Sequence, residues 1–177
     1  MNNPKGRHFI KAGLQIAGIA VLVLADQLTK NAVVNGLPYK EPVEVIHGFL
    51  SWYYTVNTGA SFSLFNEHPM ILTVVITVAL AAGLIYMIVP KAKNLFYDIC
   101  VPLILAGGTG NLIDRFTRGA VIDFICTDFI DFPVFNFADC LITCGAIVLC
   151  VYLIYGTVKE AKEEKRAKAD SSGETDE

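Results

Sequence analysis

Four long apolar runs dominate this sequence and limit what it can fold into. They cover residues 9–34, 69–90, 95–113 and 137–158. A helix needs about 20 mostly apolar residues to cross the hydrocarbon layer of a membrane, and each run is close to that length. The 177 residues are 54% hydrophobic with a mean hydropathy of +0.50, which is too apolar for an ordinary soluble domain. The sequence therefore predicts an all-α polytopic membrane protein with four transmembrane helices.

Lysine and arginine are distributed unevenly between the two sides of these predicted spans. Cytoplasmic loops of membrane proteins collect such residues. Ten of the fourteen lie at the N-terminus, between the second and third spans, or after the fourth: Lys5, Arg7, Lys11, Lys91, Lys93, Lys159, Lys162, Lys165, Arg166 and Lys168. We therefore expect both termini to be cytoplasmic. A cleavable secretory signal ending near Ala25 is an alternative, but its removal would leave three spans and place the basic tail outside, against this bias.

The segments outside the spans differ in kind. Residues 41–65 are rich in β-branched and aromatic residues and are bounded by proline and glycine, which favours strands over helix. We expect them to form a small sheet on the outer membrane face. Residues 1–158 are predicted to form one integral membrane domain. Residues 159–177 are predicted to be a charged cytoplasmic tail that begins as a helix and ends disordered.

The sequence gives no sign of a metal or cofactor site. The three histidines are scattered, and the five cysteines lack paired CxxC spacing and lie mostly within predicted spans, as packing residues do. The net charge of −3 does not indicate nucleic-acid binding. We therefore expect no metal, no cofactor and no nucleic-acid partner.

The first span carries a polar group near its outer end. An ionised side chain at the centre of a membrane helix costs about 2.5 to 3.5 kcal/mol, so each such group needs a partner or a function. Asp26, Thr29 and Lys30 follow the spacing i, i+3 and i+4 on one helix face, and Asp26 is expected to pair with Lys30. Alternatively, Lys30 extends to the outer interface.

A second polar stripe ends the third span. Asn111, Asp114 and Arg118 follow the spacing i, i+3 and i+7, and Arg115 is expected to satisfy Asp114 or a neighbouring helix end. Three glycines between residues 107 and 110 precede the stripe, which allows another helix to approach closely. A phosphate-binding loop is the rival interpretation of these glycines, but no Walker lysine follows them.

Two aspartates are the candidate catalytic residues. Asp123 lies in the apolar stretch "VIDFI", a setting that tends to raise the pKa of a carboxyl group. Asp139 lies in the first turn of the fourth span, after Asn136, which is suited to cap that helix. Because the third span ends and the fourth begins on the same side, both carboxylates are expected to meet at the outer edge of the bundle. Such a pair shares a proton, and one member acts as a base on water while the other acts as an acid toward the substrate.

With these motifs assembled, the sequence resembles the bacterial lipoprotein signal peptidase, or signal peptidase II, family. The resemblance rests on four motifs in order: "DQLTK" in the first span, "NTGASFS" after the expected strands, "GGTGNLIDRFTRGAVIDF" across the end of the third span and "FPVFNFAD" at the start of the fourth. Several ordered motifs with four spans are more specific than any single motif. One departure is Ser61, where the family often has alanine.

The resemblance implies a monomeric aspartic endopeptidase of the cell membrane. It would remove signal peptides from prolipoproteins by cleaving before a diacylglyceryl-modified cysteine, at an active site on the extracytoplasmic face beside a small β-cradle. Asp123 and Asp139 would be its catalytic pair. The resemblance further implies that Asn57, Gly59, Asn111, Arg115 and Asn136 bind substrate or support the pair, and that Asp26, Lys30 and Asp114 brace the polar core.

Two other functions stay open from the residues alone. A small proton or ion carrier would also hold carboxylates within a membrane, although its charges should follow a path near the midplane instead of clustering at one face. A noncatalytic scaffold would use its polar residues only to join helices. Ion flux in liposomes would indicate the carrier, and a loss of assembly on replacing Asp123 would indicate the scaffold.

Overall fold

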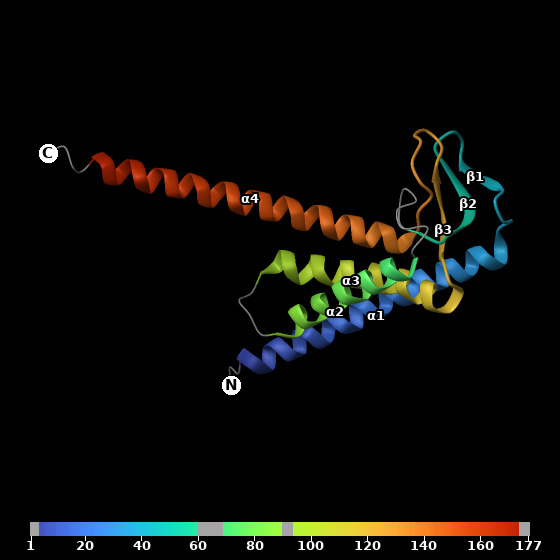
Figure 1. Cartoon of the computed structure of the whole chain (residues 1–177), viewed down its shortest axis with the longest axis horizontal. Coiled ribbons are helices and arrows are strands. Elements are labelled where there is room, and N and C mark those ends of the chain that lie inside the picture. Colours follow the sequence, from blue (N-terminus) through green and yellow to red (C-terminus); the bar gives the residue numbers. More distant parts are fainter. Residues whose placement is uncertain (1–3, 60–68, 90–93, 174–177) are drawn as a thin grey trace.

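The computed structural model describes residues 4–59, 69–89 and 94–173, which form four helices and one small sheet. The helices are α1 (Pro4–Gly36), α2 (Pro69–Ile88), α3 (Leu95–Arg118) and α4 (Phe137–Gly173). Figure 1 shows α3 between its neighbours, with the sheet at the end of the bundle where α1 and α3 finish and α4 begins. The all-α membrane fold with a small sheet, expected from the sequence, is confirmed.

The helices have the length and composition of membrane spans. Within the described residues, His8–Gly36, Leu95–Arg118 and Phe137–Lys165 are long and apolar enough to cross a membrane, and Thr73–Ile88 is a shorter apolar helix. The whole of α2 has 20 residues, none of them charged, and at 1.5 Å per residue it extends about 30 Å. The second predicted span therefore corresponds to a helix that matches the hydrocarbon thickness.

Three of the helices extend beyond the predicted spans. The helix α1 starts at Pro4 and ends at Gly36, and α3 continues to Arg118, where Gly119 closes it with a left-handed φ of 75°. The helix α4 continues through the mixed-charge tail to Gly173, and Figure 1 shows it projecting past the other helices. These extensions are polar, so a boundary predicted from hydropathy lies inside the helix, and the helical backbone hydrogen bonds continue past it.

Small residues on α3 allow the helices to approach closely. A Cβ atom added at Gly107 would collide with the backbone oxygen of Ala138 on α4, and one added at Gly108 would collide with Leu80 on α2. These glycines therefore bring α2 and α4 to either side of α3, which confirms the predicted role of the glycine stretch in helix packing.

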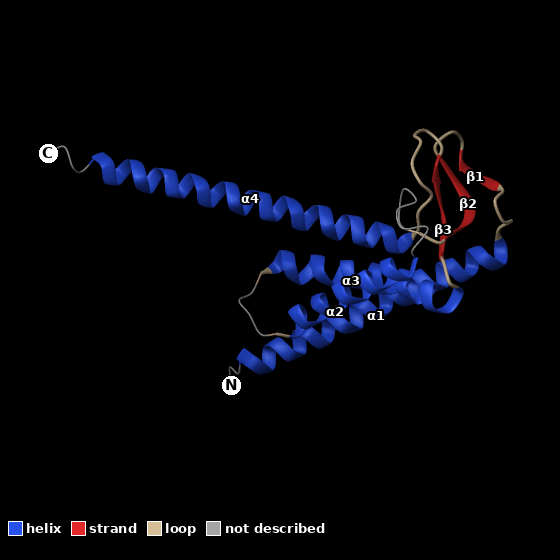
Figure 2. Cartoon of the chain, in the orientation of Figure 1, coloured by secondary structure: helices blue, strands red, loops and turns tan. Residues whose placement is uncertain are grey.

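Three antiparallel strands form the sheet in the order β1 (Pro42–Ile46), β2 (Leu50–Asn57) and β3 (Val121–Thr127). Figure 2 shows the sheet in red, beside the ends of the helices. The strands expected within residues 41–65 are confirmed as β1 and β2, and the third strand comes from the segment between α3 and α4.

The sheet packs on the last turns of α1. Ile122 and Phe124 of β3 form a buried cluster with Val33 of α1, and Trp52 and Tyr54 of β2 pack around it. Side chains alternate between the two faces of a strand, so Asp123 points away from this cluster toward α3 and α4. The apolar face of β3 thereby fixes the direction of its one carboxylate.

Candidate active site

The two candidate catalytic aspartates come from different elements. Asp123 lies on β3, where it pairs with Thr55 of β2, and only 3% of its surface is exposed. Asp139 lies in the first turn of α4 and is half-buried. Both lie at the end of the bundle that carries the sheet, as the sequence predicts.

A reciprocal cap fixes Asp139 at the start of α4. The backbone N–H of Asp139 donates to Asn136 Oδ1 at 3.0 Å, and the backbone N–H of Asn136 donates to Asp139 Oδ2 at 3.1 Å. This is the geometry of a capping box, in which two otherwise unpaired N–H groups are satisfied by each other's side chains. The predicted role of Asn136 as the cap is confirmed.

Two asparagine amides connect the carboxylates. Asn136 Nδ2 donates to Asp123 Oδ1 at 2.6 Å and to Asn111 Oδ1 at 3.2 Å. Asn111 Nδ2 in turn donates to Asp139 Oδ1 at 2.8 Å. The chain from Asp123 through Asn136 and Asn111 to Asp139 therefore consists of three hydrogen bonds between groups on β3, α3 and α4.

The loop after β2 holds the other side of Asp123. Asn57 Nδ2 donates to Asp123 Oδ2 at 3.0 Å, and Asn57 Oδ1 accepts the backbone N–H of Gly59 at 3.0 Å. Arg115 donates to the carbonyl of Gly59 at 3.1 Å and to that of Asn111 at 3.2 Å. All five residues expected to support the pair thus contact it or one another. Ser61, the one noted departure from the family pattern, lies outside the described residues.

Burial raises the pKa of Asp123 to about 6, and the negative charge of Asp139 adds to the effect. Hydrogen bonds from Asn57 and Asn136 act in the opposite direction, because they favour the ionised carboxylate. The net result is a carboxyl group that keeps its proton at a higher pH than a solvated aspartate does.

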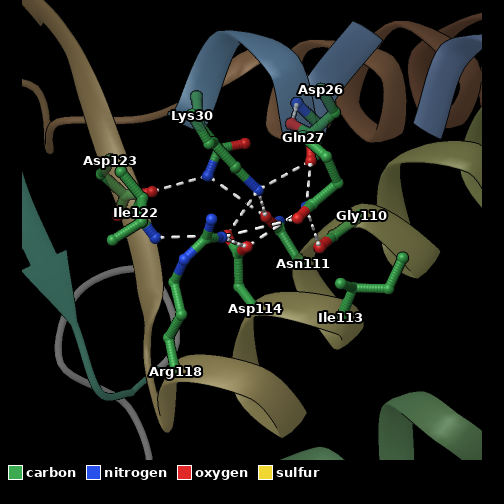
Figure 3. A network of polar contacts seen from close by, with 12 residues as sticks. Asp26, Gln27, Lys30, Gly110, Asn111, Ile113, Asp114, Arg118, Ile122 and Asp123 are labelled. Atoms are coloured by element: carbon green, nitrogen blue, oxygen red, sulfur yellow. Dashed lines mark hydrogen bonds and ion pairs between the residues drawn. The ribbon is translucent and has the colours of Figure 1, made fainter. Parts of the chain in front are cut away.

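An ionic cluster, defined here as Asp26, Lys30, Asp114 and Arg118, lies beside Asp123 (Figure 3), and its members other than Arg118 are fully buried. Lys30 Nζ is 2.9 Å from Asp26 Oδ2 and 2.9 Å from Asp114 Oδ2, and all three side chains have no exposed surface. Arg118 contacts the other oxygen of Asp114. The predicted pairing of Asp26 with Lys30 is confirmed, and Lys30 does not extend to the interface.

Of the two alternatives for Arg115, the pairing with Asp114 is wrong. Arg118, and not Arg115, pairs with Asp114, while both guanidinium contacts of Arg115 go to backbone carbonyls. The i,i+4 spacing of Asp114 and Arg118 places them on one helix face, whereas Arg115 is one residue beyond Asp114 and points in a different direction.

The ionic cluster also holds the start of α4. Asp26 Oδ1 accepts the backbone N–H of Ala138 at 3.1 Å, one residue before Asp139. A Cβ atom added at Gly110 would collide with the Asp26 carboxylate, so this glycine leaves the room that the contact needs. Asp26 is therefore linked to Asp139 through the backbone of α4.

Sequence analysis missed the contribution of Gln27. Its Nε2 donates to Asp26 Oδ2 at 3.2 Å, to the carbonyl of Gly110 at 3.1 Å and to Asp114 Oδ1 at 3.2 Å. The sequence contained a signal for this role: Gln27 is an amide near the outer end of an apolar span, between Asp26 and Lys30, and an amide placed there needs hydrogen-bond partners.

A cavity of about 550 Å³ opens beside Asp139. Asn111 and Arg115 lie in its wall, and the rest of the lining is mostly apolar: Ile76, Gly108, Phe132, Pro133, Val134, Phe135, Cys140, Ile142, Thr143 and Cys144. A half-buried carboxylate at the edge of a mostly apolar cavity is an arrangement that can orient a bound chain and present water to it.

The described residues contain no cluster of three or more histidine, cysteine, aspartate or glutamate side chains placed to hold a metal ion. The donors around the two candidate aspartates are amides and backbone N–H groups. The arrangement therefore brings two carboxyl groups together with neutral hydrogen-bond donors.

Comparison with known proteins agrees with this geometry. A family model described as signal peptidase (SPase) II matches residues 18–155. The lipoprotein signal peptidase of Enterococcus faecalis is 42% identical over 147 residues, which is 82% of this chain and 90% of the relative. That of Lactobacillus johnsonii is 35% identical over 150 residues, which is 85% of this chain and 97% of the relative.

A solved structure described as a bacterial membrane enzyme, determined by the in meso method at 2.3 Å resolution, is similar with a TM-score of 0.76. It is 32% identical, and the match covers 82% of this chain and 90% of that one. Sequence and fold agree over most of the chain, and the residues that the family model matches include every candidate site residue. The chain therefore belongs to the signal peptidase II family.

Proposed function

We propose that this protein is a membrane aspartic endopeptidase that removes signal peptides from prolipoproteins by cleaving before a diacylglyceryl-modified cysteine. The observation that carries the proposal is the chain of three hydrogen bonds that joins Asp123 to Asp139 at the edge of the cavity. The family supports the processing of prolipoproteins.

The chemistry follows from two neighbouring carboxyl groups that hold one proton between them. The ionised carboxylate removes a proton from water, the water oxygen attacks the peptide carbonyl carbon, and the protonated carboxyl gives its proton to the carbonyl oxygen. The tetrahedral intermediate then collapses: the departing nitrogen takes the proton from the carboxyl that received one, the C–N bond breaks, and one hydroxyl of the intermediate gives its proton to the other carboxylate as the carbonyl re-forms, which restores the starting state of the pair. The raised pKa of Asp123 supports this scheme because it keeps a proton on this carboxyl up to about pH 6, where a solvated aspartate is already ionised.

The surroundings of the pair suit a substrate that arrives within the membrane. The cavity beside Asp139 has mostly apolar walls, and an apolar signal peptide would bury its side chains there. We propose a multi-pass, monomeric enzyme of the cell membrane with both termini cytoplasmic and its site toward the extracytoplasmic face. Residues 1–158 would form the peptidase domain, and residues 159–177 the cytoplasmic tail.

The test uses purified protein and two synthetic peptides that differ only in the diacylglyceryl group on the cysteine. We expect the wild type to cleave the lipidated peptide and to leave the unlipidated one nearly intact. Asp123→Asn and Asp139→Asn should each lower kcat by about 10⁴-fold, the upper range for a lost acid or base. The matched control is Asp131→Asn, which changes an exposed carboxylate outside the pair and should retain activity.

Three results would contradict parts of this proposal. Retained cleavage by either asparagine variant would contradict the two-aspartate mechanism. Equal cleavage of the two peptides would show that the enzyme does not require the lipid. Ion flux in liposomes that contain the protein, without cleavage of either peptide, would favour the carrier.

A further inference from the structure

Lys30 makes one contact that its charge does not require. Its ammonium has three N–H donors, and all three are used: on Asp26, on Asp114, and on Asn111 Oδ1 at 2.8 Å. The first two contacts offset its charge within a fully buried site. The third goes to the neutral amide of Asn111 on α3 (Figure 3). That amide belongs to the hydrogen-bond chain between the two aspartates.

This contact determines which way the amide of Asn111 faces. Lys30 offers only donors, so the carbonyl of Asn111 must point toward it, and Asn136 Nδ2 donates to the same oxygen. The amino group then points toward Asp139 Oδ1, to which it donates at 2.8 Å. A rotated amide would face donors with its amino group and a carboxylate with its carbonyl, and all three hydrogen bonds would be lost.

We propose that Lys30 is a positioning residue for peptide hydrolysis, acting on Asp139 through the amide of Asn111. The inference rests on the proposed function. Lys30 has no exposed surface and does not line the cavity beside Asp139, and its direct hydrogen bond to the chain between the two aspartates is the one to Asn111. Its third N–H group keeps an amide donor directed at one oxygen of Asp139, and the substrate and water meet the carboxylate in that fixed geometry.

A purely structural role for Lys30 predicts a different outcome when the charge of the cluster is restored. Lys30→Met leaves Asp26 and Asp114 with only Arg118, so the buried cluster carries a net negative charge and the protein should lose stability. Adding Asp26→Asn returns the cluster to neutrality. The asparagine keeps an oxygen that can accept the N–H of Ala138, so the start of α4 stays in place.

The first experiment measures Tm in detergent micelles, and kcat and KM on the lipidated peptide. We expect the Asp26→Asn, Lys30→Met double variant to regain most of the Tm that Lys30→Met loses. Its kcat should stay about 100-fold below that of the wild type, the scale expected when a reacting group is misplaced, while KM changes little. Recovery of kcat together with Tm would overturn the proposal.

The second experiment tests the route through Asn111. Lys30→Met, Asn111→Ala and both changes together are compared in an Asp26→Asn background, with kcat expressed per folded molecule. If Lys30 acts through Asn111, adding Lys30→Met to Asn111→Ala should cause no further loss of kcat. Losses that multiply would overturn the proposal, and expressing kcat per folded molecule keeps the comparison valid if these variants lose stability.

These outcomes are distinguishable from a failure of the proposed function. A wild-type protein that cleaves neither peptide contradicts the peptidase itself. A wild-type protein that cleaves the lipidated peptide, with unchanged kcat in the charge-balanced variant, contradicts only the role of Lys30.

Discussion

Two polar regions lie side by side at one end of the bundle, and they differ in how their charges are balanced. The ionic cluster sets the carboxylates of Asp26 and Asp114 against the cations of Lys30 and Arg118, all within salt-bridge contact. The pair of Asp123 and Asp139 has no such contact with a lysine or arginine among the described residues. Its donors are amides and backbone N–H groups.

We propose that the ionic cluster uses its charges to hold the structure together and that the pair uses its charge in the reaction. The two cations of the ionic cluster offset its two carboxylates, so the cluster can join the helices without an unpaired buried charge. In the proposed mechanism the pair, which has no cation in contact, holds one proton between its two carboxyl groups, as hydrolysis by an acid and a base requires. The asparagines between the regions connect them without cancelling the charge of the pair.

The largest effect on stability is expected from unbalancing the cluster. Asp114→Asn leaves Lys30 and Arg118 with one carboxylate, and should cost about 3 to 5 kcal/mol of unfolding free energy, as breaking a buried ion pair does. Asp139→Asn, its control, loses one hydrogen bond and should cost about 1 kcal/mol. Chemical unfolding in detergent measures both losses. Equal losses would contradict the expectation that the ionic cluster contributes more to stability than the pair does.

A smaller effect is expected from the pH dependence of the pair. The folded pKa of Asp123 is about 6 against 3.8 for the free carboxyl, so the unfolded chain releases this proton first as the pH rises. The wild type should therefore lose up to about 3 kcal/mol of stability relative to Asp123→Asn between about pH 4 and about pH 7. Unfolding of both proteins across this range checks the sign, and a difference that stays constant contradicts it.

The junction between the two regions is expected to be sensitive to volume. Gly110→Ala would push a methyl group against the Asp26 carboxylate, and should destabilise the protein by about 1 to 3 kcal/mol. Gly18→Ala is the matched control, because a Cβ atom added there meets nothing within 4 Å. A measured loss for Gly18→Ala equal to that for Gly110→Ala would show that packing at the junction is not the cause.

The smallest effect is expected from an exposed pair with the same spacing as Asp26 and Lys30. Lys159 and Glu163 are also four residues apart on a helix, but their side chains are 62% and 65% exposed. Lys159→Ala should change the unfolding free energy by less than about 0.5 kcal/mol. A larger loss would show that spacing, and not burial, determines the contribution of such pairs in this protein.

The sequence by itself determined the elements and the residue types of the site. Apolar runs of membrane-spanning length predicted the helices, β-branched and aromatic residues predicted strands, and helical spacing predicted that Asp26 meets Lys30. These are local properties, since periodicity and spacing act over a few residues. The same reasoning placed Asp123 and Asp139 at one end of the bundle from the direction of the chain.

Only the tertiary structure decided the contacts between distant segments. Gln27 meets Asp114 across 87 residues, and Asp26 meets Ala138 across 112. The orientation of the Asn111 amide depends on donors from α1 and α4 at once. No local pattern encodes such contacts, because they depend on how closely the glycines of α3 let the other helices approach and on which donors and acceptors then come within hydrogen-bond distance.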